Sequence, residues 1–218
     1  MKYQAVIFDL DGTLLNTLED LADSVNFALK QFGYPIRTIA EVRAFVGNGV
    51  QKLIERAVPE QTTMEKTLAC LEVFRNYYAK NMRNKTCLYE GIKELLQELN
   101  ERKIKMAIVS NKFDAAVKEL KKELFSEYIQ VAIGESIIVP KKPNPSGVFA
   151  ALEELGVKKE NALYVGDSEV DIMTAKNAGV ISVGVTWGFR DCTVLENSKA
   201  NHIIHTPQRL LDIIDFSI

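Results

Sequence analysis

The feature that most constrains the fold is a regular alternation of short apolar segments with amphipathic ones from Cys87 onward. Strands that alternate with helices of about ten residues form βαβ units and a parallel sheet. We predict strands at 106–109, 129–133, 162–165, 181–185 and 202–204, and helices at 91–101, 114–122, 145–155 and 170–178, with a last helix after Pro207. The sequence therefore predicts an α/β core built on a doubly wound, Rossmann-like parallel sheet.

The N-terminus supplies one more strand, Val6–Phe8, which ends in two carboxylates and a glycine. Side chains alternate along a strand, so we expect Asp9 and Asp11 to point to the same side. Two neighbouring anions raise each other's pKa unless a cation lies between them. The alternative is a solvated acidic turn after an ordinary strand, and this stretch alone does not decide between the two.

The segment from about residue 16 to 84 differs from the rest, because it has helical periodicity and no strand pattern. Four helices are predicted there, at 16–32, 38–45, 48–57 and 63–81, with Gly or Pro residues between them. We therefore expect a helical domain over 16–86, inserted into an α/β core that comprises 1–15 and 87–218. The two connections between these parts fall near Leu14–Thr17 and Asn84–Leu88.

Open parallel sheets bind ligands at the carboxyl ends of their strands. Chemically capable residues occur at four such places: Asp9 with Asp11, Ser110 with Asn111, Lys142, and Asp167 with Asp171. Each has a plainer interpretation: a helix N-cap for Ser110–Asn111, a solvated charge for Lys142, a turn residue for Asp167, and a favourable first-turn anion for Asp171. Taken together, those interpretations require four independent coincidences at one edge of one sheet.

The four places resemble, in order, the four motifs of the haloacid dehalogenase-like hydrolase superfamily. The run D-L-D-G-T-L at 9–14 resembles the first motif, Ser110 the second, Lys142 the third, and G-D-S-E-V-D at 166–171 the fourth. The helical insert after the first motif resembles the type 1 cap of that superfamily. The resemblance thus covers essentially the whole chain.

The resemblance implies a phosphoryl-transfer mechanism. By it, Asp9 is the nucleophile that forms an aspartyl-phosphate, and covalent capture divides one difficult step into two. Asp11 then protonates the departing alkoxide and later accepts a proton from the hydrolytic water. The phosphate oxygens are expected to be bound by four residues, Gly12, Ser110, Asn111 and Lys142.

Charge at these positions indicates a metal ion. Four carboxylates sum to −4, and Lys142 brings the sum only to −3, so a phosphate dianion requires a further cation. Oxygen ligands with room for water favour Mg²⁺ over Zn²⁺. The expected direct ligands are the Asp9 carboxylate, the Asp11 backbone carbonyl and the Asp167 carboxylate, whereas Asp171 is expected to orient water around the metal.

Within the helical insert, Arg43–Gly49 and the following residues through Arg56 and Ala57 resemble the corresponding stretch of phosphoglycolate phosphatases. Gly47 and Asn48 lie at the start of the helix predicted at 48–57, whose free amides suit a substrate carboxylate. Arg43, or less favourably Arg56, can pair with that anion. The alternative is a glycine-rich connection with a surface arginine. The function predicted is a Mg²⁺-dependent phosphomonoester hydrolase acting on a small phosphorylated metabolite, most like phosphoglycolate phosphatase.

Other functions compete with this hypothesis. A sugar phosphomutase of the β-phosphoglucomutase type would use the same aspartyl-phosphate, and a pyrophosphatase or nucleotidase would differ only in substrate. A receiver-like regulatory module also groups carboxylates, Ser or Thr and Lys around Mg²⁺, but it has no need of so long an insert. A dehalogenase needs neither a metal nor a second acid, and Asp11 and Asp167 speak against it.

Composition sets the remaining limits. The 218 residues are 47% hydrophobic and 26% charged, with a formal net charge of −2, which is typical of a globular protein and argues against nucleic-acid binding. No apolar run has the length of a membrane span, and the early first strand leaves no room for a signal peptide. The cysteines Cys70, Cys87 and Cys192 form no metal-ligand or disulfide pattern, so a cytoplasmic location is expected. The oligomeric state is not readable.

Overall fold

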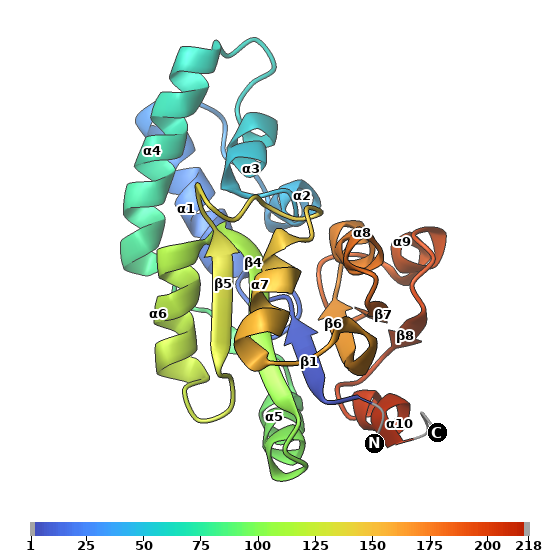
Figure 1. Ribbon diagram of the computed structural model, residues 1–218. Coiled ribbons are helices and arrows are strands. Elements are labelled where there is room, and N and C mark those ends of the chain that lie inside the picture. Colours follow the sequence, from blue (N-terminus) through green and yellow to red (C-terminus); the bar gives the residue numbers. More distant parts are fainter. Residues whose placement is uncertain (1–2, 216–218) are drawn as a thin grey trace. The chain divides into compact units, whose positions relative to one another are not determined.

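The computed structural model describes residues 3–215, and its elements are labelled in Figure 1. The chain divides into two compact units, one formed by Met1–Leu14 with Leu88–Ile218 and the other by Leu15–Cys87. We describe each unit by itself.

The first unit contains a six-stranded sheet in the order β5-β4-β1-β6-β7-β8, and its strand pairs are parallel. Its strands are β1 (Ala5–Phe8), β4 (Lys105–Phe113), β5 (Val131–Glu135), β6 (Ala162–Gly166), β7 (Ile181–Val185) and β8 (His202–Ile204). The chain runs outward from β1 through β4 to β5, then returns to the other side of β1 as β6. Strand β1 is therefore where the strand order reverses, which is where doubly wound sheets bind ligands. The predicted fold class is confirmed.

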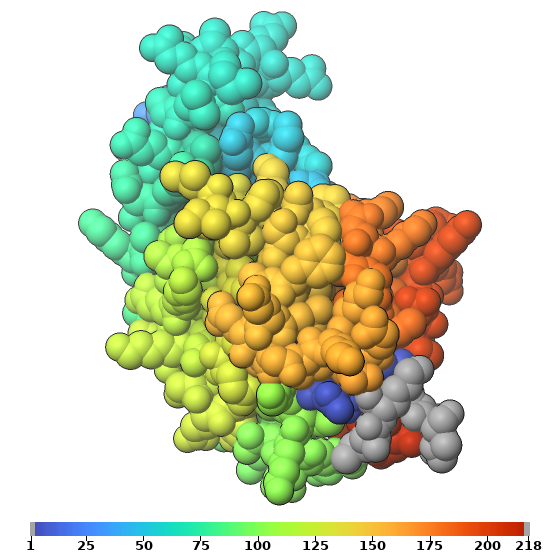
Figure 2. Space-filling model, viewed as in Figure 1, coloured from blue at the N-terminus to red at the C-terminus, as the bar shows by residue number. Residues whose placement is uncertain are grey.

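Helices cover the sheet because each has one apolar stripe and connects two parallel strands. These are α5 (Ile92–Glu101), α6 (Asp114–Leu124), α7 (Ser146–Leu155), α8 (Glu169–Ala178), α9 (Cys192–Asn197) and α10 (Arg209–Asp215), with a 3₁₀ turn at Lys159–Asn161. Figure 1 shows α7 crossing one face of the sheet, where Val148 and Leu152 join Ile7, Val109 and Tyr164 in a buried core. In the space-filling view of Figure 2, side chains close over most of the sheet on this face.

Strand β4 is longer than its sequence predicts. The apolar run ends at Val109, but the strand continues through the polar residues to Phe113, which pairs with Glu135 of β5 after a register shift. The extension is possible because Gly134 offers no side chain there: a Cβ would lie 2.5 Å from the Asp114 Cα and 2.6 Å from the Lys112 carbonyl oxygen. The short helix α9 was also not predicted.

The second unit consists of α1 (Leu18–Gln31), α2 (Ile39–Phe45), α3 (Val50–Ala57) and α4 (Met64–Asn81). These helices begin and end within two residues of the predicted ranges. Helix α2 begins with a capping box, in which Thr38 accepts from the Glu41 N–H and Glu41 accepts from the Thr38 N–H. The two-residue strands β2 (Leu15–Asn16) and β3 (Cys87–Leu88) pair with each other, and they are too short to leave a strand pattern in the sequence.

A buried carboxylate ties the end of the second unit to its first helix. Asp20 of α1 accepts hydrogen bonds from the backbone N–H groups of Lys85 (3.0 Å) and Thr86 (2.9 Å) and from the Thr86 hydroxyl (2.8 Å). The residue is 2% exposed. Three donors around one carboxylate make this a firm attachment for the segment that leaves the unit.

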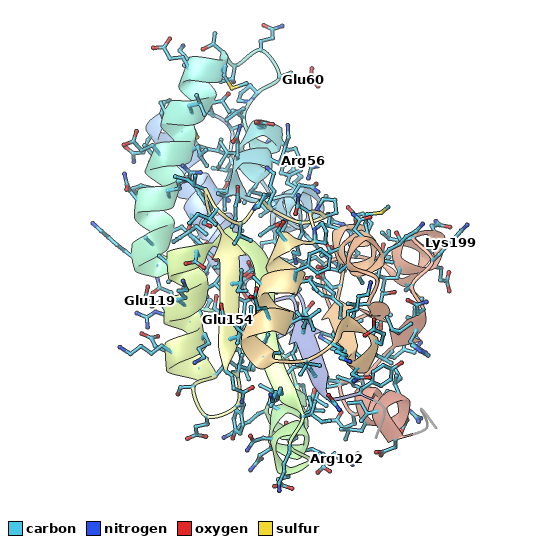
Figure 3. All side chains as sticks on the ribbon, in the orientation of Figure 1. Arg56, Glu60, Arg102, Glu119, Glu154 and Lys199 are labelled. Atoms are coloured by element: carbon cyan, nitrogen blue, oxygen red, sulfur yellow. The ribbon has the colours of Figure 1, made fainter. Side chains whose placement is uncertain are left out.

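Most charged side chains lie on the outside of each unit. Figure 3 labels examples on α6 and α7, Glu119 and Glu154, both of which are exposed. Among the helices of residues 3–215, none has both the length and the apolar composition required to cross a membrane.

Candidate active site

The site begins where β1 ends. The Asp9 N–H donates to the Val165 carbonyl (2.8 Å), so the main chain at Asp9 still follows β6. Gly12 then turns the chain with a φ of +91°, a conformation that favours glycine. A Cβ at Gly12 would lie 2.5 Å from Asp167 Oδ2. The turn after β1 is thus packed directly against the carboxylate that follows β6.

Lys142 joins two carboxylates in the interior of the first unit. Its Nζ lies 2.7 Å from Asp9 Oδ1 and 2.7 Å from Asp171 Oδ1, and its side chain is 5% exposed. The Asn111 side chain holds the Lys142 main chain at two points: its Oδ1 accepts from the Lys142 N–H (2.6 Å) and its Nδ2 donates to the Lys142 carbonyl (3.2 Å). The Asn111 side chain is therefore engaged in orienting Lys142, and the binding of phosphate by the Asn111 amide stays a prediction.

Both carboxylate oxygens of Asp171 accept hydrogen bonds. Oδ2 accepts from the Ser168 N–H (3.1 Å) and hydroxyl (2.6 Å), closing the N-terminus of α8 with a capping box. Oδ1 accepts from Lys142 and lies 3.3 Å from the Tyr164 hydroxyl. A side chain on Gly166 would overlap Asp171. Asp171 is consequently a fixed acceptor that orients Lys142.

Asp167 is held by a backbone group from a distant loop. The Phe189 N–H donates to Asp167 Oδ2 at 2.6 Å, and Asp167 is 2% exposed. Gly188 packs so closely that a Cβ there would overlap both the Asp167 side chain and the Gly12 carbonyl. Sequence reasoning did not identify this role for the 188–189 loop, because it depends on tertiary contact alone.

Three carboxylates converge: Asp9, Asp167 and Asp171 each offer an oxygen within 4.8 Å of the others. Burial raises the pKa of Asp9 to about 7, with Lys142 opposing the rise and Asp171 adding to it. Burial, and then the charges of Asp171 and Asp9, raise the pKa of Asp167 well above its usual value. Burial lowers the pKa of Lys142, but Asp171 and Asp9 outweigh it and raise this pKa well above normal. The cluster has the charge and the oxygen atoms to attract a cation.

Asp11 lies apart from this cluster, and its carboxylate pairs with a different lysine. Lys112 Nζ is 2.9 Å from Asp11 Oδ1 and 3.1 Å from Oδ2, and the Lys112 side chain is 2% exposed. The Lys112 N–H also donates to the Ser110 hydroxyl at 3.3 Å. Lys112 was missed from the sequence because the strand was predicted to end before it. In the extended β4, Ser110 and Lys112 are two residues apart on one strand, which is the signal that was available.

Tyr164 is another residue that sequence reasoning treated only as part of an apolar strand. Its hydroxyl lies 3.2 Å from the Val109 carbonyl and 3.3 Å from Asp171 Oδ1, and its residue is 1% exposed. Burial raises its pKa well above its usual value, although Lys142 opposes the rise. Tyr164 therefore stays neutral and contributes a hydroxyl dipole beneath the charged cluster.

The predicted substrate residues of the helical insert all lie in the second unit. Gly47 and Gly49 have φ values of 121° and 83°, and Gly49 is the residue before α3. Arg56, labelled in Figure 3, donates from Nη1 to the Phe45 carbonyl (2.7 Å) and from Nη2 to Asn48 Oδ1 (2.8 Å). Arg56 thereby holds the loop that contains Gly47 and Asn48. Arg43 lies near the end of α2 and is partly exposed.

Comparison with known proteins identifies the family. The family description that matches residues 6–185 is haloacid dehalogenase-like hydrolase. The chain belongs to the haloacid dehalogenase-like hydrolases. Among named relatives, the phosphoglycolate phosphatase of Vibrio parahaemolyticus is 35% identical, over 97% of this chain and 96% of that protein. The phosphoglycolate phosphatase of Mannheimia succiniciproducens is 36% identical, over 98% of this chain and 99% of that protein.

Solved structures of haloacid dehalogenase-like hydrolases agree. A crystal structure of a candidate phosphoglycolate phosphatase from Lactobacillus delbrueckii subsp. bulgaricus superposes with a TM-score of 0.93. It is 35% identical to this chain and covers 98% of it and 99% of its own length. These similarities indicate a phosphatase of the family. The predicted family and enzyme class are confirmed.

Proposed function

We propose that this haloacid dehalogenase-like phosphatase is Mg²⁺-dependent, transfers the phosphoryl group of its substrate to Asp9, and acts on phosphoglycolate. The observation that carries the proposal is the buried arrangement of Asp9, Lys142 and Asp171 beside Asp167. A carboxylate held by an ammonium at 2.7 Å is oriented before the substrate arrives. The named relatives supply the choice of substrate.

The chemistry assigned to this chain's residues has two steps. An oxygen of Asp9 attacks phosphorus, the bond from phosphorus to the ester oxygen breaks, and Asp11 gives a proton to the departing alkoxide. Asp11, left as a carboxylate by the first step, then takes a proton from water as the water oxygen attacks phosphorus. The bond to Asp9 breaks, which releases phosphate and restores the Asp9 carboxylate and the Asp11 carboxylic acid. Positioning and charge stabilisation dominate such transfers. The groups proposed to bind the phosphoryl oxygens are Lys142, the Ser110 hydroxyl and the amides of Gly12 and Asn111.

The residues present suit Mg²⁺. Asp9 and Asp167 are buried carboxylates with raised pKa values, so their ionised forms are favoured by a nearby cation. Hard oxygen donors match the preference of this ion. The proposed ligands are the carboxylates of Asp9 and Asp167 and the Asp11 carbonyl. Asp171, both of whose oxygens accept hydrogen bonds, is proposed to orient water around the ion. When bound, the ion neutralises negative charge on the phosphoryl group.

The domain roles are proposed as well. The α/β core, residues 1–15 and 87–218, carries the chemistry, and the helical part, residues 16–86, acts as a cap. Within the cap, Arg43, Gly47 and Asn48 are proposed to contact the substrate carboxylate. The cysteines within residues 3–215 are all free, which supports a cytoplasmic location.

The experiment is a phosphate-release panel that compares kcat/KM for phosphoglycolate, hexose phosphates, nucleotides and pyrophosphate, with Asp9→Asn as the blank. We expect phosphoglycolate to rank first, turnover to stop in EDTA, and Mg²⁺ to restore it. Wild-type turnover by Asp9→Asn would overturn the nucleophile, and full turnover in excess chelator would overturn the metal. Formation of a hexose bisphosphate or an isomerised hexose phosphate would indicate a mutase instead.

A further inference from the structure

The ion pair between Lys112 and Asp11 is not used by the mechanism above, and it has an unusual construction. Lysine is almost never fully buried unless it is paired. Here the Lys112 side chain is 2% exposed, against 16% for Asp11, and its Nζ contacts both carboxylate oxygens, at 2.9 and 3.1 Å. An ammonium that touches both oxygens restrains the rotation of the carboxylate about its own axis.

The backbone that carries Lys112 is itself held firmly. The Gly134 N–H donates to Asp114 Oδ1 at 3.0 Å, and Phe113 pairs with Glu135. A Cβ at Gly134 would lie 2.6 Å from the Lys112 carbonyl oxygen, so β5 lies close against this part of β4. The Lys112 N–H also donates to the Ser110 hydroxyl. One residue of a fixed strand thus contacts Asp11 through its side chain and Ser110 through its main chain.

We propose that Lys112 is a positioning residue for Asp11, which sets the direction in which the protonated Asp11 carboxyl group presents its O–H to the leaving group. The proposal rests on the proposed function, because it requires Asp11 to be the acid. Loss of this positioning would slow reactions in proportion to how much the departing oxygen needs a proton. Alkoxides need one, whereas nitrophenolate is stable without it.

The test compares kcat/KM for phosphoglycolate, glycerol phosphate and p-nitrophenyl phosphate in wild type, Lys112→Met and Lys112→Arg. This constant reports steps up to departure of the leaving group. For Lys112→Met we expect a loss of about 30- to 100-fold with both alkyl phosphates and less than about 3-fold with p-nitrophenyl phosphate. Lys112→Arg retains the charge and should recover part of the loss. The control is Lys122→Met, which removes an exposed lysine in the last turn of α6 and should change nothing.

The outcomes separate the alternatives. Equal losses with all three substrates would show a structural role and overturn the proposal. A loss confined to phosphoglycolate would show that Lys112 contacts the substrate carboxylate, which also overturns it. If wild type releases phosphate from none of the three, the proposed function itself is wrong and the role of Lys112 is wrong with it.

A double variant provides an independent readout. If Lys112 acts through Asp11, adding Lys112→Met to Asp11→Asn should lower kcat/KM for glycerol phosphate by less than about 3-fold further. If the double variant instead loses kcat/KM by the product of the two single-variant losses, the proposal is contradicted. Circular dichroism and thermal unfolding accompany each variant. If Lys112→Met does not fold, the ratio of losses between alkyl and nitrophenyl substrates in Lys112→Arg decides the question in the same way.

Discussion

Lys142 Nζ lies 2.7 Å from Asp9 Oδ1, and this buried pair joins a loop that follows β5 to the end of β1. Lys142→Met should leave Asp9 and Asp171 buried without their cation. Breaking a buried pair costs about 3–5 kcal/mol of the free energy of unfolding, and we expect turnover to fall at least about 100-fold. Denaturant unfolding and phosphate release measure the two effects. The neighbouring Lys141→Met is the control, and equal behaviour of the two variants would contradict this interpretation.

The metal-free protein should lose stability as the pH rises. Burial raises the pKa of Asp9 from 3.8 in the unfolded chain to about 7 in the folded protein. The folded state therefore binds more protons between those values, so stability is highest at the acid end and falls through this window. In EDTA, Asp9→Asn should raise the free energy of unfolding at pH 8 by roughly 2–4 kcal/mol and have little effect near pH 4.

Thermal unfolding at several pH values, with and without Mg²⁺, checks this expectation. Mg²⁺ should stabilise wild type at pH 8 much more than at pH 5, because protons compete for the same carboxylates. Asp212→Asn, at an exposed pair on α10, is the matched control and should leave the profile unchanged. If the free energy of unfolding of the metal-free wild type rises from pH 5 to 8, the predicted direction of its pH dependence is wrong.

Gly188→Ala should displace Asp167. A Cβ at this position would overlap the side chain of Asp167, a proposed metal ligand, and the carbonyl of Gly12, whose amide is proposed to bind phosphate. Overpacking costs about 1–3 kcal/mol, and we expect the apparent Mg²⁺ affinity to fall at least about 10-fold, measured by the Mg²⁺ dependence of turnover. Gly33→Ala is the comparison: its φ is +67° and nothing lies within 4 Å. It should lose only about 1 kcal/mol of stability, with kcat unchanged.

Arg56→Gln should weaken substrate binding more than catalysis. Arg56 donates to the Phe45 carbonyl and to Asn48 Oδ1, so its loss releases the loop proposed to bind the substrate carboxylate. We expect KM for phosphoglycolate to rise about 10-fold, with kcat changed less than about 2-fold. Lys52→Met removes an exposed pair with Glu55 on the same helix and serves as the control. An unchanged KM would contradict the assigned role of this loop.

Asp20→Asn should destabilise the helical unit without touching any proposed site residue. The substitution removes the charge that accepts from Lys85 and Thr86, and it turns one acceptor into a donor facing other donors. We expect a loss of about 2–3 kcal/mol in the free energy of unfolding, measured in urea. Asp23→Asn provides the control, because its pair with the Lys85 ammonium is exposed and should contribute almost nothing to the free energy of unfolding.

Periodicity predicted most of the fold because it is local. Neighbouring residues along the chain form the apolar stripes of α1 and α4 and the apolar runs of β1, β6 and β7. In the structure, each of these elements lies within a few positions of its predicted range. The strand β4 shows the limit. Residues 110–112 are polar and lie outside the predicted strand, yet the strand continues through them to Phe113 because Gly134 of β5 lets the two backbones approach.

The candidate site likewise has one part that the sequence predicts and one part that depends on tertiary contacts. Parallel strands bring their carboxyl ends to one edge, so the proximity of Asp9 to Asp167 and Asp171 follows from recognising the strands and their order. Strand order does not predict the partner of each charged group. Lys142 pairs with Asp9 and Asp171, Lys112 pairs with Asp11, and the Phe189 N–H donates to Asp167, in each case from a segment far along the chain.

The amino-acid sequence by itself determined the α/β class, the inserted helical segment, the family and the residue types available for phosphoryl transfer. Tertiary structure alone decided which lysine pairs with which aspartate, that the Asn111 side chain orients Lys142, and that Arg56 holds the 45–48 loop. The physical reason is that periodicity and turn chemistry depend on neighbours within a few residues. Ion pairs and close glycine contacts depend instead on strand order and register, which place distant residues within 3 Å of each other.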